Sequence, residues 1–115
     1  MNAAVIRTDP TLNLLGRRVW TYETTGSTQD EAHARAAEGE AEGAIFNAES
    51  QTRGRGRHGR SWHCPAGKNI LVSILLRPPI APRDAQILTC AAAVGVCEAA
   101  AEASSLFVRI KWPND

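Results

Sequence analysis

The sequence predicts one domain of mixed α and β structure. Its 115 residues fit a single domain, since domains typically contain about 50 to 250 residues. Hydrophobic residues make up 43% of the chain and charged residues 22%, which favours a globular domain over a disordered, collagen-like or coiled-coil chain. Segments with strand-like alternation are separated by segments with helical spacing, so both kinds of element are expected.

The first expected strand follows an irregular start. Residues 1–18 show no strong period and are expected to form a poorly specified lead-in, which leaves 19–115 as the domain proper. Residues 19–24 alternate and include Trp20 and Tyr22, whose side chains favour a pleated surface. A second strand is expected at 44–49, after a polar loop that contains Glu40, Glu42 and Gly43.

A helix is expected between these two strands. Gly26 ends the first strand, and either Ser27 or Thr28 can cap the helix that follows. Asp30 and Glu31 then fall in the first turn, where the helix dipole favours negative charge. The helix is expected to end near a glycine at position 39.

The second half of the chain continues the alternation of elements. Residues 69–76 are apolar at nearly every position, which predicts a strand buried on both faces. Prolines end that run, and 83–103 carry apolar residues at three- and four-residue spacing, which predicts the longest helix. A last strand is expected at 106–110.

Several features bear on the compartment. Uninterrupted apolar runs are short, so no membrane span is expected, and the first residues lack the apolar core of an export signal. The cytoplasm is therefore the expected location. The three cysteines are an odd number without metal spacing, which favours free thiols; a zinc site that uses Cys64 with His58 or His63 is the less favoured alternative.

The most unusual segment is residues 51–62, where no regular element is expected. Arg53, Arg55, Arg57 and Arg60 fall within eight residues, no acid interrupts them, and three glycines separate them. Glycines let a ligand approach the backbone, and arginine guanidinium groups pair with phosphate or carboxylate through two parallel hydrogen bonds. Together these residues predict a loop that binds an anion.

Three other interpretations of this loop are open. Its glycines fit the dinucleotide fingerprint GxGxxG, but that motif must open a helix at once, and the segment after it is a poor helix start. An arginine- and glycine-rich run can bind a nucleic-acid backbone, although Trp62 is the one flanking aromatic residue. A solvated loop without a function is the third, but long irregular loops in small domains are usually functional.

Three segments in order closely resemble biotin protein ligases. Residues 51–62, read with Glu49, resemble the biotin-binding loop, whose usual form is GRGRRGR before a Trp; here His58 replaces the middle arginine. Ser27-Thr28-Gln29 matches the family's Ser-Thr-Asn or Ser-Thr-Gln. The segment 111–115 has the family's sequence KWPND. The resemblance covers about residues 19–115.

The resemblance implies an α+β fold with a mixed sheet and helices on one side, similar to class II aminoacyl-tRNA synthetases. It implies ATP-dependent activation of biotin to biotinyl-5′-AMP, and transfer to a lysine of a biotin carboxyl carrier domain of acetyl-CoA carboxylase or a related carboxylase. Biotin, ATP and Mg²⁺ are the implied ligands. No nucleic-acid or membrane partner is expected, and a homodimer is an option for a full-length parent.

The same resemblance implies roles for individual residues. Arg57 and Lys111 would be catalytic. The residues that would contact biotin are Ser27, Thr28, Gln29, Gln51, Arg55, Gly56 and Arg57. Those that would contact ATP are Arg57, Arg60, Trp62, Lys111 and Asn114, the last two facing its phosphates and Mg²⁺. Without the resemblance, Ser27 or Thr28 could equally be a helix cap, and either of the last two tryptophans could be a core residue.

The resemblance also implies that the chain is the N-terminal half of a catalytic domain. Family members continue after KWPND with an Arg-Lys pair, a glycine-rich segment and a small β-barrel-like domain, and some carry a helix-turn-helix domain in front. The fold is therefore expected to be incomplete here. The alternative function is a ligase-derived fragment without activity, at most a partial ligand-binding module. A lipoate ligase or octanoyltransferase shares the fold class but is disfavoured, because the GRGR loop is particular to the biotin branch.

Overall fold

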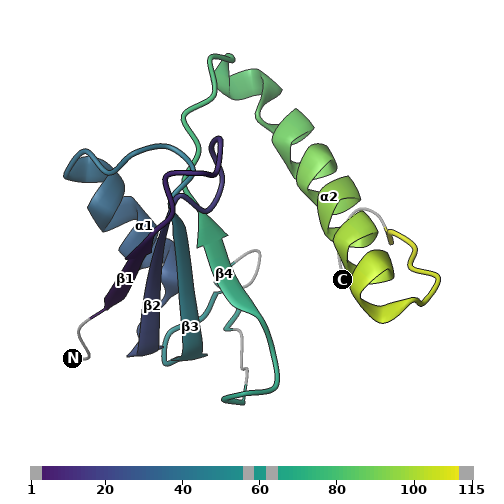
Figure 1. Ribbon diagram of the computed structural model, residues 1–115, viewed down its shortest axis with the longest axis horizontal. Helices are drawn as coiled ribbons and strands as arrows, with labels where there is room; N and C mark the ends of the chain where they lie inside the picture. The colour runs from purple at the N-terminus through teal and green to yellow at the C-terminus, as the bar shows by residue number, and fades with distance from the viewer. Residues whose placement is uncertain (1–3, 56–58, 62–64, 112–115) are drawn as a thin grey trace. The chain divides into compact units, whose positions relative to one another are not determined.

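The structure is a computed structural model that describes residues 4–55, 59–61 and 65–111. The chain divides into two compact units, Met1–Arg77 and Pro78–Asp115, and each is described here by itself. The first unit contains the sheet and one helix, and the second contains the long helix (Figure 1).

The first unit is built on a four-stranded mixed sheet. Its strands are β1 (Val5–Thr8), β2 (Arg18–Thr25), β3 (Ile45–Gln51) and β4 (Leu71–Ile74), in the spatial order β1-β2-β3-β4. β2 and β3 are parallel, whereas β1 and β4 pair antiparallel to β2 and β3 at the two edges. The expected mixed sheet is therefore confirmed.

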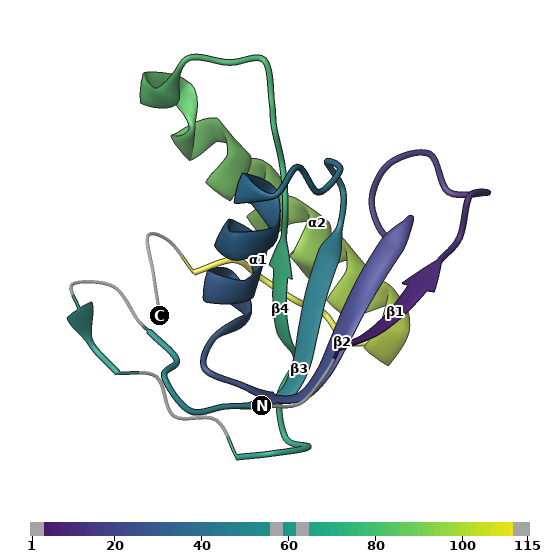
Figure 2. The same ribbon diagram turned by 90° about the vertical axis from the view of Figure 1, so that its left-hand side faces the viewer.

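Helix α1 (Thr28–Ala37) connects the two parallel strands and lies on one face of the sheet (Figure 2). Beneath it lies a core of four buried residues, Tyr22, Ala44, Phe46 and Ala48. Trp20 stacks on Phe46, with ring centroids 5.7 Å apart. The predicted strand, helix and strand over 19–49 are confirmed, because each carried its own local signal of alternation, capping or termination.

Two predictions about the sheet are wrong. Residues 1–18 were expected to be irregular, but Val5–Thr8 form β1, whose side chains are exposed; this strand is set by pairing with β2 and not by a pattern of its own. β4 was expected to be buried on both faces. Leu71 is buried, while Val72 and Ile74 are 41% and 45% exposed; within the first unit, α1 covers one face of the sheet.

The second unit contains the short 3₁₀ helix η2 (Pro82–Asp84) and α2 (Gln86–Ser104). The predicted long helix is confirmed, and Ser105 ends it in the left-handed conformation with φ 60°. The strand predicted at 106–110 is wrong, since this segment has no regular structure. No strand lies beside it within the described part of this unit, and without a ladder its apolar pattern does not produce a strand. Cys90 and Cys97 are free, as predicted.

No membrane span was expected from the sequence, and one described helix bears on that expectation. Pro82–Ser104 is long and apolar enough, by length and composition, to span one. The apolar runs in this segment are short and are separated by small residues, so no span was predicted there from the sequence. The core helices of soluble proteins pass the same test, so the finding assigns no location.

Candidate ligand site at the carboxyl ends of β2 and β3

The candidate site lies where the two parallel strands end. β2 ends at Thr25 and β3 at Gln51, and these two residues are paired in register. Two residues separate the end of β2 from the start of α1, so polar side chains from the helix and from both strands meet at this edge. Crevices at the carboxyl ends of parallel strands are common ligand sites. Four residues predicted to bind a ligand lie here: Ser27, Thr28, Gln29 and Gln51.

Ser27 caps α1. Its backbone is extended, with φ −164° and ψ 135°, and its hydroxyl accepts a hydrogen bond from the Gln29 N–H at 3.2 Å. The side chain is buried. The capping role predicted as an alternative is therefore confirmed for this residue. Because a hydroxyl can both donate and accept hydrogen bonds, a cap can also contact a ligand.

Thr28 connects three elements. Its backbone N–H donates to Gln51 Oε1 at 2.7 Å, which ties the helix to the end of β3. Its hydroxyl lies 2.8 Å from the hydroxyl of Ser73 on β4. Thr28 is 4% exposed, so these bonds form in an environment where an unpaired hydroxyl is costly. They fix the position of the site relative to the sheet.

Ser73 is a residue of this region that the sequence analysis missed. The available signal was its polarity, since it interrupts the apolar segment of β4. In register it pairs with the buried Phe46, and so it lies on the face that α1 covers.

Behind these residues lies a second polar contact. The Thr25 hydroxyl donates to Glu31 Oε2 in the first turn of α1. Burial raises the pKa of the neighbouring Tyr22 to about 12, and the negative charge of Glu31 adds to the effect. The Tyr22 phenol, which lies next to Glu31, therefore stays protonated at neutral pH.

Arg53 continues the pairing of the two strands beyond their ends. The Thr52 N–H donates to the carbonyl of Thr25 at 3.0 Å, and the Arg53 N–H donates to that of Gly26 at 2.7 Å. The Arg53 side chain then folds back over Gly26, where a Cβ atom would lie 2.7 Å from Nη2. A residue with no side chain is therefore needed for the guanidinium to lie in this position.

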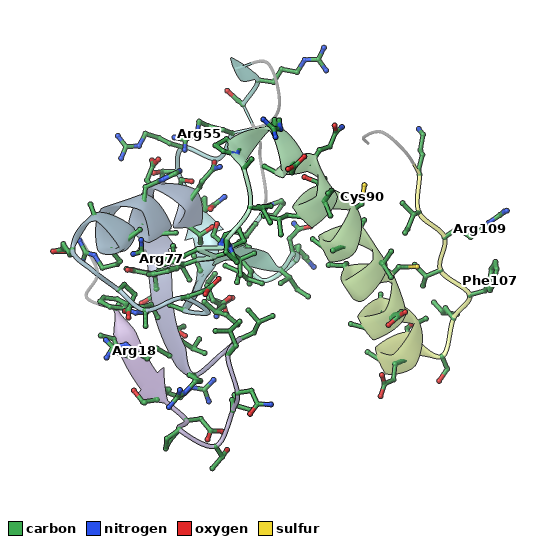
Figure 3. The ribbon with its side chains drawn as sticks, turned by 90° about the horizontal axis from the view of Figure 1, so that it is seen from above. Arg18, Arg55, Arg77, Cys90, Phe107 and Arg109 are labelled. Atoms are coloured by element: carbon green, nitrogen blue, oxygen red, sulfur yellow. The ribbon has the colours of Figure 1, made fainter. Side chains whose placement is uncertain are left out.

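Arg55 reaches the first turn of α1 from the arginine loop, and Figure 3 labels it beside that helix. Its Nη2 donates to Asp30 Oδ1 at 2.7 Å and to Gln29 Oε1 at 3.2 Å. The hydrogen bond from Arg55 lowers the pKa of Asp30 below its ordinary value, and Asp30 in turn raises that of Arg55. The backbone of Arg55 is also paired with that of Ser61 in an isolated bridge, which holds the base of the loop.

Of the remaining predicted site residues, four lie outside the described residues: Gly56, Arg57, Trp62 and Asn114. Arg60 is exposed. Lys111 belongs to the second unit. Cys64, His58 and His63 of the zinc alternative also lie outside the described residues. Within 4–55, 59–61 and 65–111, no group of three or more His, Cys, Asp or Glu side chains could hold a metal ion.

A hollow of about 290 Å³ lies at the other end of the sheet and is lined in part by Arg18, Glu42 and Ala44. Two of its charged side chains make contacts within the protein. Arg18 Nε lies 3.2 Å from Glu40 Oε2, and the Glu42 carboxylate accepts the N–H of Arg77 at 2.7 Å. Figure 3 shows Arg18 well apart from Arg55. The candidate site is therefore the end that carries Arg53 and Arg55.

Comparison with known proteins identifies the family. A family model described as the biotin/lipoate A/B protein ligase family matches residues 16–115. The chain belongs to this family. It is 38% identical to the bifunctional ligase/repressor BirA of Bacillus subtilis over 102 residues, and these residues make up 89% of this chain and 31% of that protein. It is 40% identical over 96 residues to the biotin–[acetyl-CoA-carboxylase] ligase of Mycobacterium tuberculosis, covering 79% of this chain and 36% of that protein.

A human relative, biotin–protein ligase, is 37% identical over 78 residues, which are 64% of this chain and 11% of that protein. The chain thus spans about a third of the length of the two bacterial relatives named above. Family membership confirms the resemblance to biotin protein ligases and the α+β fold class expected from it. The roles of individual residues stay predictions.

Proposed function

We propose that this chain carries the biotin-binding part of a biotin protein ligase. The whole reaction is the ATP-dependent activation of biotin to biotinyl-5′-AMP, followed by transfer to a lysine of a biotin carboxyl carrier domain in acetyl-CoA carboxylase or a related enzyme. The observation that carries the proposal is the meeting of Ser27, Thr28, Gln29 and Gln51 with Arg55 at one end of two parallel strands. The names of the relatives support biotin over lipoate.

The chemistry of the first step suits this charge distribution. A carboxylate oxygen of biotin attacks the α-phosphorus of ATP, an oxygen–phosphorus bond forms, and the bond to the β-phosphate breaks to release pyrophosphate. Both reactants are anions, so the site must reduce their repulsion and stabilise charge on the phosphate oxygens. Arg53 and Arg55 supply positive charge at the described end of the site, and Arg57 and Lys111 are proposed as catalytic residues.

In the second step, a neutral lysine amine of the carrier attacks the acyl carbon of biotinyl-5′-AMP. An amide bond forms, AMP leaves with the electrons of the broken carbon–oxygen bond, and the amine loses its proton. The hydroxyl and amide groups of Ser27, Thr28 and Gln29 suit the ureido ring of biotin, which needs both donors and acceptors. Gln51, Arg55, Gly56 and Arg57 would line the ring and its activated carboxyl group.

The nucleotide would be held by the remaining predicted residues: Arg57, Arg60, Trp62, Lys111 and Asn114. Mg²⁺ is proposed as the counter-ion of ATP, since it is usually bound through substrate phosphates and one or two carboxylates. The described part of the chain has no three-residue group that could hold the ion, so no step is assigned to it. A cytoplasmic location and the carrier domain as partner belong to the same proposal.

The test is direct. The 115-residue chain is incubated with biotin, ATP and Mg²⁺, and biotinyl-5′-AMP is measured by mass spectrometry against a no-protein control, with lipoate in a parallel reaction. Arg57→Ala is expected to reduce the product, whereas Arg7→Ala, an equal loss of charge at an exposed position on β1, is expected to leave it unchanged. Product unaffected by Arg57→Ala would refute the proposed role of the loop. No product, with a disordered circular dichroism spectrum, would favour the inactive fragment.

A further inference from the structure

The contacts of Arg55 carry an inference about how its site is filled. Both described hydrogen bonds of its guanidinium leave from one nitrogen, Nη2, which donates to Asp30 Oδ1 at 2.7 Å and to Gln29 Oε1 at 3.2 Å. This nitrogen has two hydrogens and donates to two protein acceptors. One of the two acceptors is itself a carboxylate.

The shape of the guanidinium gives this arrangement a consequence. A carboxylate or phosphate that binds arginine through two parallel hydrogen bonds uses either Nη1 with Nη2 or Nε with Nη2. Both modes require Nη2. An anion can therefore bind Arg55 in the strong, paired geometry only after Asp30 or Gln29 has released one of the two hydrogens.

We propose that Asp30 is an internal competitor, a carboxylate that occupies Arg55 and that an incoming carboxylate or phosphate displaces. Asp30 is the group displaced in preference to Gln29 because the entering anion is repelled by its charge and not by the neutral amide. The proposal takes its natural ligand, the carboxyl or activated carboxyl-phosphate group of biotin, from the proposed function. Its test does not depend on that ligand.

The exchange needs no movement of the backbone. Arg55 is anchored by its bridge to Ser61, and the strand before it is anchored by the bond from the Arg53 N–H to Gly26. The Arg55 and Asp30 side chains are 46% and 45% exposed, so solvent and ligands reach both. A rotation of either side chain is therefore enough to open the contact.

The displaced carboxylate also keeps a positive neighbour. Besides Arg55, the positive charge of Arg53 acts on Asp30. Because Asp30 is not left without a counter-charge, displacement costs little, and an exposed ion pair of this kind is weak from the start. The competitor therefore lowers the affinity for anions without closing the site.

The test uses inorganic phosphate as the probe and backbone amide shifts of the ¹⁵N-labelled full chain as the readout. Asp30→Asn is expected to bind phosphate about two- to fivefold more tightly than the unmodified chain, the range expected for release of an exposed ion pair. Asp30→Glu, which restores the charge, is expected to return the affinity toward that of the unmodified chain. The exposed position and the conservative changes leave the fold intact.

Two controls separate competition from a general change of charge. Glu49→Gln removes the same charge from an exposed position on β3 and is expected to have a smaller effect than Asp30→Asn. In an Arg55→Gln background, Asp30→Asn is expected to bring no gain, because the coupling between the two residues is lost. An equal effect of Glu49→Gln, a gain that persists without Arg55, or no phosphate binding by any variant would each overturn the inference.

Failure of the proposed function gives a different pattern. If no variant forms biotinyl-5′-AMP but the phosphate results follow the expected order, the competitor role stands and the biotin assignment fails. If biotinyl-5′-AMP forms and Asp30→Asn binds phosphate no better than Glu49→Gln, the biotin assignment stands and the competitor role fails.

Discussion

The hydroxyl pair between Thr28 and Ser73 offers a sharp test of how the site is fixed to the sheet. Thr28→Val keeps the shape of the side chain but removes its hydroxyl, and it leaves the backbone bond to Gln51 in place. Ser73 then loses the partner that lies 2.8 Å away. A net hydrogen bond contributes about 0.5 to 1.5 kcal/mol, and an unpaired buried polar group costs about 1 to 3 kcal/mol. We therefore expect the free energy of unfolding to fall by about 1 to 3 kcal/mol.

The measurement is urea unfolding followed by circular dichroism, with the midpoint and slope compared between variants. Thr24→Val is the matched control, because Thr24 makes the same kind of pair with Ser50 at 3.0 Å but is less buried than Thr28; its loss is expected to be smaller. Combining Thr28→Val with Ser73→Ala should cost less than the sum of the two single changes, since neither hydroxyl is then left alone. Additive losses, or less than about 0.5 kcal/mol for Thr28→Val, would refute this account of the contact.

Three further predictions concern the stability of the first unit. Gly43→Ala should lower the thermal stability of this unit by more than Gly39→Ala. Both glycines have φ above +90°, but a Cβ at Gly43 would lie 2.2 Å from a backbone carbonyl oxygen, whereas one at Gly39 would meet nothing within 4 Å. Equal losses of stability would contradict this steric argument. Phe46→Ala, at a fully buried position, should cost about 3 to 5 kcal/mol, whereas Phe107→Ala, at an 89% exposed position, should cost no more than about 0.5 kcal/mol. An ultraviolet titration should give Tyr22 a pKa of about 12. Because the unfolded phenol ionises near pH 10, the contribution of the protonated Tyr22 to stability is complete below about pH 10 and is lost as the pH rises to 12. Ionisation of Tyr22 near pH 10 in the folded chain would contradict this prediction.

The elements that the sequence predicted correctly carry their own local signals. The alternation of 19–24, the cap at Ser27 and the acids that follow it need no distant partner to favour β2 and α1. β1 had no such signal, because its residues form a strand by pairing with β2. Residues 106–110 had the apolar pattern of a strand but no neighbouring strand in the described part of their unit, so the pattern predicted a strand that does not form.

The site divides in the same way. Ser27, Thr28, Gln29 and Gln51 could be selected from motifs, and the structure brings them to one edge of the sheet. The contacts that fix or occupy the site could not be predicted, since Ser73 reaches Thr28 across 45 positions of the chain and Asp30 reaches Arg55 across 25. Such contacts depend on how the strands pair, which one-dimensional spacing does not contain.

Helix α1 is attached to the rest of its unit at both ends. At its amino terminus the Thr28 N–H is bonded to Gln51, and at its carboxyl end Arg77 Nη2 donates to the carbonyls of Ala36 and Glu40 at 2.9 and 3.0 Å. Helix ends usually fray, and their amide hydrogens exchange with solvent through small local openings. Attachment at both ends raises the cost of fraying, so the whole helix should exchange on the timescale of the sheet. The first turn, which is proposed to meet the ligand, would then keep its geometry whether or not a ligand is bound, and adjustment would fall to the exposed arginine side chains.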